Sequence, residues 1–145
     1  MKIILQRVTQ SQVDVDNQTV GKISNGFLVL LGVGQGDTTL HAGSLVEKII
    51  KLRIFEDEDG KMNKDITEVG GEMLVVSQFT LYANCKKGNR PSFVEAAPPD
   101  EAKKLYEYFV KKIKEKGISV ATGQFAAHMY VELVNDGPVT LILES

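Results

Sequence analysis

The stretch MLVVSQFTL, residues 73–81, joins an apolar run to a polar segment that leads into a glycine-containing loop. A second stretch, NDGPVT at residues 135–140, places Gly-Pro between two apolar runs. The first apolar run predicts a buried strand that ends where the polar residues begin. Proline cannot donate a hydrogen bond within a sheet, so the second stretch predicts a tight turn between a strand ending at Val134 and one starting at Val139.

The segments around these stretches have the periodicity of further strands. Residues 27–33 are apolar on both faces, which predicts a central strand covered from both sides. Shorter alternating or β-branched runs predict the other strands, with a turn at residues 16–18. These runs are residues 4–9, 13–15, 19–23, 118–122, 129–133 and 139–143.

Two segments have the 3.6-residue periodicity of amphipathic helices. The first follows Asp37, its expected N-cap, and its apolar residues recur at helical spacing between positions 45 and 54. The second follows residues 98–100, carries an apolar stripe opposite its lysines and stops at Gly117. Two helices and roughly seven strands, with hairpin-length and helix-length connections mixed, predict an α+β fold with the helices packed on curved sheets.

Length and composition indicate one compact domain, residues 1–145, because no linker, low-complexity segment or repeat divides the chain. Hydrophobic residues make up 43% and charged residues 25%, as in ordinary globular proteins. The single cysteine, Cys85, excludes an internal disulfide and is typical of a reducing compartment. Nothing at the start reads as a signal peptide, and no apolar run approaches the ~20 residues of a membrane helix. We therefore expect a cytoplasmic protein without a membrane partner.

The net charge of −2 does not indicate a general nucleic-acid binder, so we expect no DNA partner. Any contact with RNA must then be local. Lys86, Lys87 and Arg90 form the one short basic cluster beside the first polar segment, and they are candidate phosphate contacts. A solvated loop explains the same residues equally well.

Thr80 is the candidate nucleophile by residue type, but a hydroxyl nucleophile needs a base within hydrogen-bond reach. Neither histidine, His41 or His128, has the surroundings of a catalytic triad. A strand-end hydroxyl that bonds local backbone groups is therefore favoured over a nucleophile. The sequence has no cysteine pair, and residues 57–59 form a solvated charge run, so we expect neither a metal nor a cofactor.

Together, SQFTL at residues 77–81 and NDGPVT at residues 135–140 closely resemble the two signature motifs of the D-aminoacyl-tRNA deacylases. The resemblance covers the whole chain, from ILQRV at residues 4–8 to Val139 and Thr140. It implies a barrel-like fold with two packed helices, and a homodimer in which each active site borrows from the partner subunit. It also implies the activity, which is hydrolysis of the ester between a D-amino acid and the 3′-terminal end of tRNA. Such editing serves translation quality control.

The resemblance implies substrate-assisted catalysis, in which the ribose hydroxyl next to the ester orients or activates a water. The protein would supply position and electrostatics. The candidate catalytic segment is Ser77, Gln78, Phe79 and Thr80, because backbone N–H groups are freed where the strand ends. The Phe79 ring could stack on a base, but burial is its expected use.

The resemblance also implies that Gly137 and Pro138 form a cis Gly-Pro bond inserted into the partner's pocket. Its rigid backbone would reject L side chains and admit D-residues and glycine. The resemblance places Arg7 near this motif, where an inward-pointing guanidinium would bond backbone carbonyls and hold the motif's orientation. Alternation alone leaves an outward surface position open. Phe125 and Met129 are typical core residues, and the resemblance implies that they line the pocket for the terminal adenosine.

Two other functions stay open. In the first, Thr80 is a true acyl nucleophile. In the second, the chain is a non-enzymatic dimeric module that binds RNA ends or a small metabolite, with which the acidic net charge and the missing catalytic constellation agree.

Overall fold

The computed structural model describes residues 1–145 and confirms the mixed α+β class. Two α-helices and a short 3₁₀ helix accompany eight strands. The elements are β1 (Lys2–Val15), β2 (Gln18–Ile23), β3 (Gly26–Gly32), α1 (Thr39–Ile50), β4 (Phe55–Glu56), β5 (Met62–Lys64), β6 (Glu72–Ser77), η1 (Phe79–Tyr82), α2 (Pro99–Glu115), β7 (Val120–Thr122) and β8 (Tyr130–Glu144). Neither α-helix is long and apolar enough to cross a membrane.

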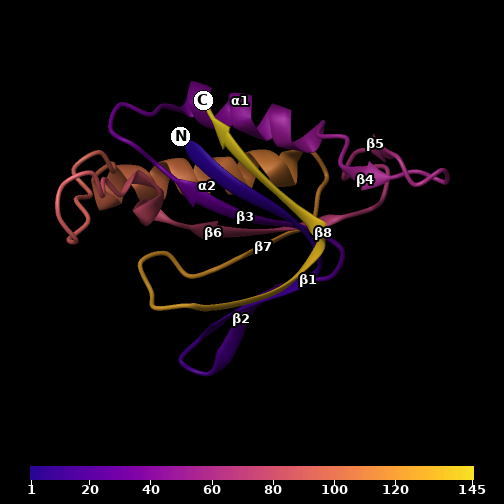
Figure 1. Ribbon diagram of the computed structural model, residues 1–145, viewed down its shortest axis with the longest axis horizontal. Coiled ribbons are helices and arrows are strands. Elements are labelled where there is room, and N and C mark those ends of the chain that lie inside the picture. The colour runs from indigo at the N-terminus through magenta and orange to yellow at the C-terminus, as the bar shows by residue number, and fades with distance from the viewer.

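The long strand β1 organises a six-stranded sheet. Its first half pairs antiparallel with β3 and its second half with β2, while β8 follows it antiparallel over nearly its whole length. Strand β6 joins β3 in parallel, and β7 joins β6 in parallel. The sheet curls until β2 approaches β7, and a Cβ atom on Gly21 would lie only 2.4 Å from the Thr122 carbonyl oxygen. The result is a nearly closed, barrel-like sheet (Figure 1).

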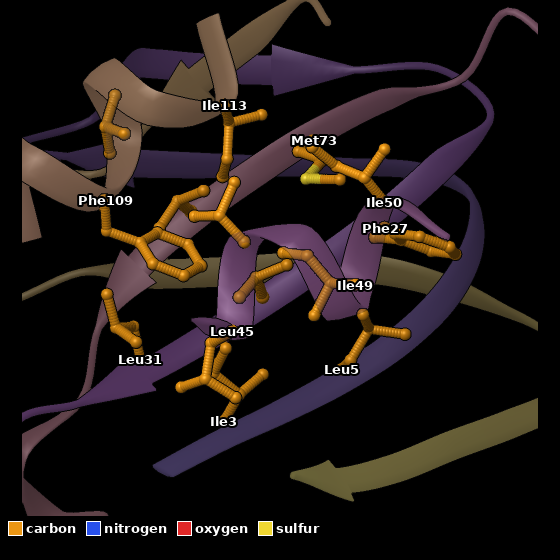
Figure 2. Packing of buried hydrophobic residues seen from close by; sticks show 14 of the residues in the cluster. Ile3, Leu5, Phe27, Leu31, Leu45, Ile49, Ile50, Met73, Phe109 and Ile113 are labelled. Carbon is orange, nitrogen blue, oxygen red and sulfur yellow. The ribbon is translucent and has the colours of Figure 1, made fainter. Parts of the chain in front are cut away.

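Both helices cover the same face of this sheet (Figure 1). Between helices and sheet lies a core of 23 buried residues, to which β3 contributes Phe27, Val29 and Leu31. A smaller cluster of seven residues fills the inside of the curl and includes Leu28 of β3. The prediction of a central strand covered on both faces is therefore confirmed. Figure 2 shows the larger core, with Leu45, Ile49 and Ile50 of α1 and Phe109 and Ile113 of α2 packed over Ile3, Leu5, Phe27, Leu31 and Met73.

The second helix begins and ends close to its predicted bounds, with Gly117 in the left-handed region at φ +82°. The first helix has a different cap from the predicted one. Thr38 is the N-cap of α1, and its backbone N–H donates to Nδ1 of His41 at 3.0 Å. Asp37 is not the cap, because its carboxylate turns back and accepts the Gly34 N–H at 2.6 Å.

The predicted tight turn at Gly137 and Pro138 is wrong, because β8 continues through both residues. In the ladder with β1, Asn135 pairs with Val8 and Thr140 with Gln6, so residues 136–139 lie opposite Arg7 alone. The Gly-Pro pair thus lies in a bulge of four residues opposite one, where a proline costs no ladder hydrogen bond. The sequence also gave no sign of the short β4–β5 hairpin, which encloses the charged turn at residues 57–60.

Candidate active site

The first polar segment begins where β6 leaves the sheet. Ser77 is the last residue of β6 paired with β3, and the Gln78 N–H donates to the Leu31 carbonyl at 2.8 Å. The chain then turns into η1, whose first internal bond runs from the Leu81 N–H to the Gln78 carbonyl at 3.3 Å. The N–H groups of Phe79 and Thr80 precede that bond, so the helix itself gives them no partner.

Tyr82 fastens the far end of η1 to the loop after β3. Its hydroxyl donates to Oδ2 of Asp37 at 3.3 Å. Burial, and then the nearby charge of Asp37, raise the pKa of the Tyr82 hydroxyl far above its usual value, so the phenol stays protonated. The ring lies against Gly34, where a Cβ atom would come within 2.5 Å of it. These contacts fix where η1 presents its amides.

A pocket of about 490 Å³ opens beside these amides and is lined mainly by apolar side chains. This volume and lining are typical of sites for small molecules. Its walls come from the ends of β3 and β6, from the first turns of α2 and from the segment before β8. Ser77, Gln78, Phe79, Phe125 and Met129 all line it, so five of the predicted site residues meet there.

Thr80 is not among the residues that line the pocket. Its side chain is exposed, and its Oγ1 accepts a hydrogen bond from Nε2 of Gln78. The ring of Phe79 lies at the pocket's rim and is 57% exposed, so the expectation that it is buried is wrong. It packs edge-on against Phe93, with ring centroids 5.0 Å apart.

Tyr106 of α2 forms the inner wall of the pocket beside Phe125, with ring centroids 5.9 Å apart. Its hydroxyl donates to the Val75 carbonyl at 2.9 Å, and burial raises the pKa of that hydroxyl to about 12. The sequence placed Tyr106 only in the apolar stripe of the helix. A tyrosine at a stripe position that leucine or isoleucine could fill was the available signal for a polar partner.

Gly137 and Pro138 lie outside the pocket of their own chain. Their peptide bond is cis, both residues are exposed, and Gly137 has φ +124°. A Cβ atom on Gly137 would lie 2.7 Å from Cγ2 of Val139 and 3.3 Å from a guanidinium nitrogen of Arg7. The bulge is therefore shaped for glycine, and it presents the Gly-Pro backbone to the surroundings.

Arg7 lies beneath this bulge and is only 3% exposed, so its side chain points inward. Its Nε donates to the Asp136 carbonyl at 3.2 Å and lies 3.1 Å from Oδ2 of the same residue. A second nitrogen donates to the Ile54 carbonyl, and a third lies 3.8 Å from Glu56. A buried guanidinium is stable only when its donors are matched in this way.

The remaining candidates are three basic residues and the two histidines. Lys86, Lys87 and Arg90 are exposed in the loop between η1 and α2. His128 reaches the pocket wall but is exposed and packs edge-on against Tyr130, while His41 serves the cap of α1. No group of three or more acidic, histidine or cysteine side chains is arranged to hold a metal ion.

The sequence model of the D-Tyr-tRNA(Tyr) deacylase family matches residues 4–144. The chain belongs to this family. It shares 59% identity over 145 residues with the D-aminoacyl-tRNA deacylase of Thermosipho africanus, covering 100% of this chain and 97% of the relative. It shares 60% identity over 145 residues with the protein of the same name from Geotalea uraniireducens, of which 94% is covered. The D-Tyr-tRNA(Tyr) deacylases are hydrolases, and this chain is accordingly an enzyme of that class.

Two solved structures have the same fold as this chain. One, named c-Myc DNA Unwinding Element Binding Protein, superposes with a TM-score of 0.94 at 40% identity and covers 100% of this chain and 99% of its own. Another, a probable eukaryotic D-amino acid tRNA deacylase, superposes with a TM-score of 0.83 at 17% identity over 99% of this chain and 98% of its own, and shows the shared fold.

Proposed function

We propose that the protein hydrolyses the ester bond between a D-amino acid, or glycine, and the 3′-terminal ribose of tRNA. Water adds to the ester carbonyl, the bond from that carbon to the ribose oxygen breaks, and the ribose oxygen takes up a proton. The products are the free amino acid and uncharged tRNA. Family membership supports the reaction, and the mainly apolar pocket lined by Gln78 and Phe79 at the end of β6 supports its location.

The Phe79 N–H, which belongs to a residue of the pocket lining, is the proposed donor to the oxyanion that develops on the ester carbonyl, and the Thr80 N–H follows it at the start of η1. They precede the first hydrogen bond of η1, and one well-aimed donor contributes about 3 kcal/mol to such a step. The adjacent ribose hydroxyl of the substrate orients or activates the water. This route needs no side-chain nucleophile, in agreement with the position of Thr80 outside the pocket lining.

The proposed enzyme works as a homodimer in which Gly137 and Pro138 of one protomer enter the pocket of the other. The observation that carries this proposal is that the two residues are exposed and line no part of their own chain's pocket. A backbone wall held by Arg7 would collide with an L side chain, whereas a D side chain would point away and glycine would have nothing to collide. Selection would then act by exclusion.

The cellular setting of this reaction is the cytoplasm, where removal of D-residues from tRNA serves translation quality control. Phe125 and Met129 would contact the terminal adenosine, because both line the pocket. Lys86, Lys87 and Arg90 would contact phosphates from the exposed loop next to η1.

The deciding experiment is parallel deacylation of D-tyrosyl-tRNA, L-tyrosyl-tRNA and glycyl-tRNA by the purified protein. We expect rapid loss of the D and glycyl esters while the L ester is spared. Loss of the D ester alone would keep the deacylase activity and remove selection by exclusion. Binding of tRNA without loss of any ester would favour the non-enzymatic module instead.

A further inference from the structure

An open groove of about 900 Å³ runs along α2, beside β7 and the segment that follows it. It is distinct from the pocket, but Tyr106 and Phe125 line both. The two rings thus form a common wall, and the groove leads from this wall along the length of α2. Nothing in the reaction described above uses this groove.

Three lysines line the helical side of the groove: Lys103, Lys111 and Lys114. All three are exposed. The carboxylate of Glu115 also lines the groove, but the Lys112 ammonium holds it at 2.7 Å, closer than Lys111 at 3.8 Å. Glu107 is the other acidic residue of the lining. In a chain with a net charge of −2, this groove is therefore a local site of positive charge.

The spacing of the lysines follows the helix axis. Residues 103, 111 and 114 recur at multiples of three and four, so they share one face of α2. At ~1.5 Å per residue, the distance along the axis from Lys103 to Lys114 is about 16 Å. A row of ammonium groups of this length suits a polyanionic strand better than a single anion, because each group can meet a separate charge.

We propose that this groove binds the phosphate backbone of the single-stranded 3′ end of tRNA, in the nucleotides that precede the terminal adenosine. The inference rests on the proposed function, which places that adenosine in the pocket on the other side of Tyr106 and Phe125. A strand leaving the pocket past these rings enters the groove directly. Lys103, Lys111 and Lys114 then neutralise successive phosphates. The basic residues of the loop between η1 and α2 contact a different part of the tRNA.

The test compares the wild-type protein with the triple variant Lys103→Gln, Lys111→Gln, Lys114→Gln on two substrates. For D-tyrosyl-tRNA, we expect KM at low salt to rise by about tenfold. We also expect the slope of log KM against log salt concentration to fall by roughly 2, because each of the three contacts with a single strand contributes ~0.7 to that slope. For D-tyrosyl-adenosine, which has no phosphate, we expect kcat/KM to stay within about twofold of wild type. A defect in the pocket or in folding would lower both activities.

The matched control is Lys48→Gln, Lys61→Gln, Lys104→Gln, which removes the same charge from exposed positions outside the groove. We expect the control to keep the wild-type salt slope. An unchanged slope in the groove variant, an equal loss in the control, or an altered oligomeric state of the groove variant would each overturn the inference, the last by making the groove a contact between subunits. If the wild-type protein cleaves neither ester, the proposed function fails, and binding of uncharged tRNA to the same variants still decides the groove.

Discussion

Thr80 carries the hydroxyl that residue type alone suggests as the nucleophile. Its Oγ1 accepts a hydrogen bond from Gln78, however, and Thr80 is not part of the pocket lining. We expect Thr80→Val, which keeps the shape and removes the hydroxyl, to retain kcat/KM for D-tyrosyl-tRNA within about threefold, because the proposed catalytic group is the backbone N–H. Removal of a true nucleophile lowers kcat by roughly a thousandfold or more. Single-turnover deacylation distinguishes the two, and a loss of that size would establish Thr80 as the nucleophile.

Gly137 is the residue whose replacement tests selection by exclusion. Its φ of +124° and the 2.7 Å approach of a Cβ atom to Val139 make Gly137→Ala strained, and we expect a loss of about 1–3 kcal/mol in the free energy of unfolding. We also expect L-tyrosyl-tRNA to become a substrate, because relief of the strain must move the Gly-Pro backbone.

Gly36→Ala is the control for this variant, since Gly36 has φ +79° and open space around a Cβ atom. It should lose stability but keep its rejection of L-tyrosyl-tRNA. Full exclusion of the L ester by a folded Gly137→Ala protein would show that this part of the backbone does not select chirality.

At the scale of elements, the Tyr106 hydroxyl joins α2 to β6 by donating to the Val75 carbonyl. Burial raises its pKa to about 12, so folding favours the protonated phenol. Since the unfolded chain loses this proton near pH ~10, the stabilisation is complete below that pH and disappears as the pH rises toward 12. Each shifted unit corresponds to about 1.4 kcal/mol, which predicts a loss of roughly 2–3 kcal/mol across this window.

Urea unfolding at pH 9 and at pH 11.5 measures this effect, with Tyr106→Phe as the comparison. We expect the variant to be about 1 kcal/mol less stable than wild type at pH 9, because the Val75 carbonyl loses its donor, and to show a smaller further loss at pH 11.5. Identical pH dependence in the two proteins would mean that folding does not raise the pKa of Tyr106.

The elements themselves were predictable to the extent that their signals are local. The stripe of α2, its proline start and Gly117 all lie within one stretch of sequence, and the helix was found there. The bulge in β8 was not, because a Gly-Pro pair looks like a turn until its partner strand is known. That partner is β1, more than a hundred residues away in sequence, and only the pairing reveals that the motif lies opposite Arg7.

For the whole molecule, too, local sequence signals identified some residues of the proposed site and missed others. The strand end at Ser77 and the candidates Phe125 and Met129 could be named from the sequence and meet in one pocket. Tyr106 was missed as a pocket wall, since an aromatic residue in an apolar stripe is ordinarily core. The direction of Arg7 was open, because alternation along a strand does not say which face is buried when both faces of the sheet are covered.

The proposal that each pocket is completed by the partner subunit makes a prediction about mixed dimers. Ala127 lines the pocket, so Ala127→Trp should fill it and abolish deacylation. Gly137→Ala should leave the pocket open but impair the Gly-Pro wall. In a dimer with one chain of each kind, the open pocket receives the intact Gly-Pro pair from its partner. We therefore expect mixed dimers to cleave D-tyrosyl-tRNA at about half the wild-type rate per dimer and to spare L-tyrosyl-tRNA.

The two chains can carry different affinity tags at the C-terminus, so that only mixed dimers are recovered for this assay. Homodimers of Ala127→Trp should be inactive, and those of Gly137→Ala should cleave both esters. If each chain instead supplied its own Gly-Pro wall, the open pocket of the mixed dimer would keep the impaired wall and cleave the L ester as readily as the Gly137→Ala homodimer does. Since a site shared between subunits predicts that the same mixed dimer spares the L ester, the ratio of L to D cleavage decides between a site within one chain and a site shared by two.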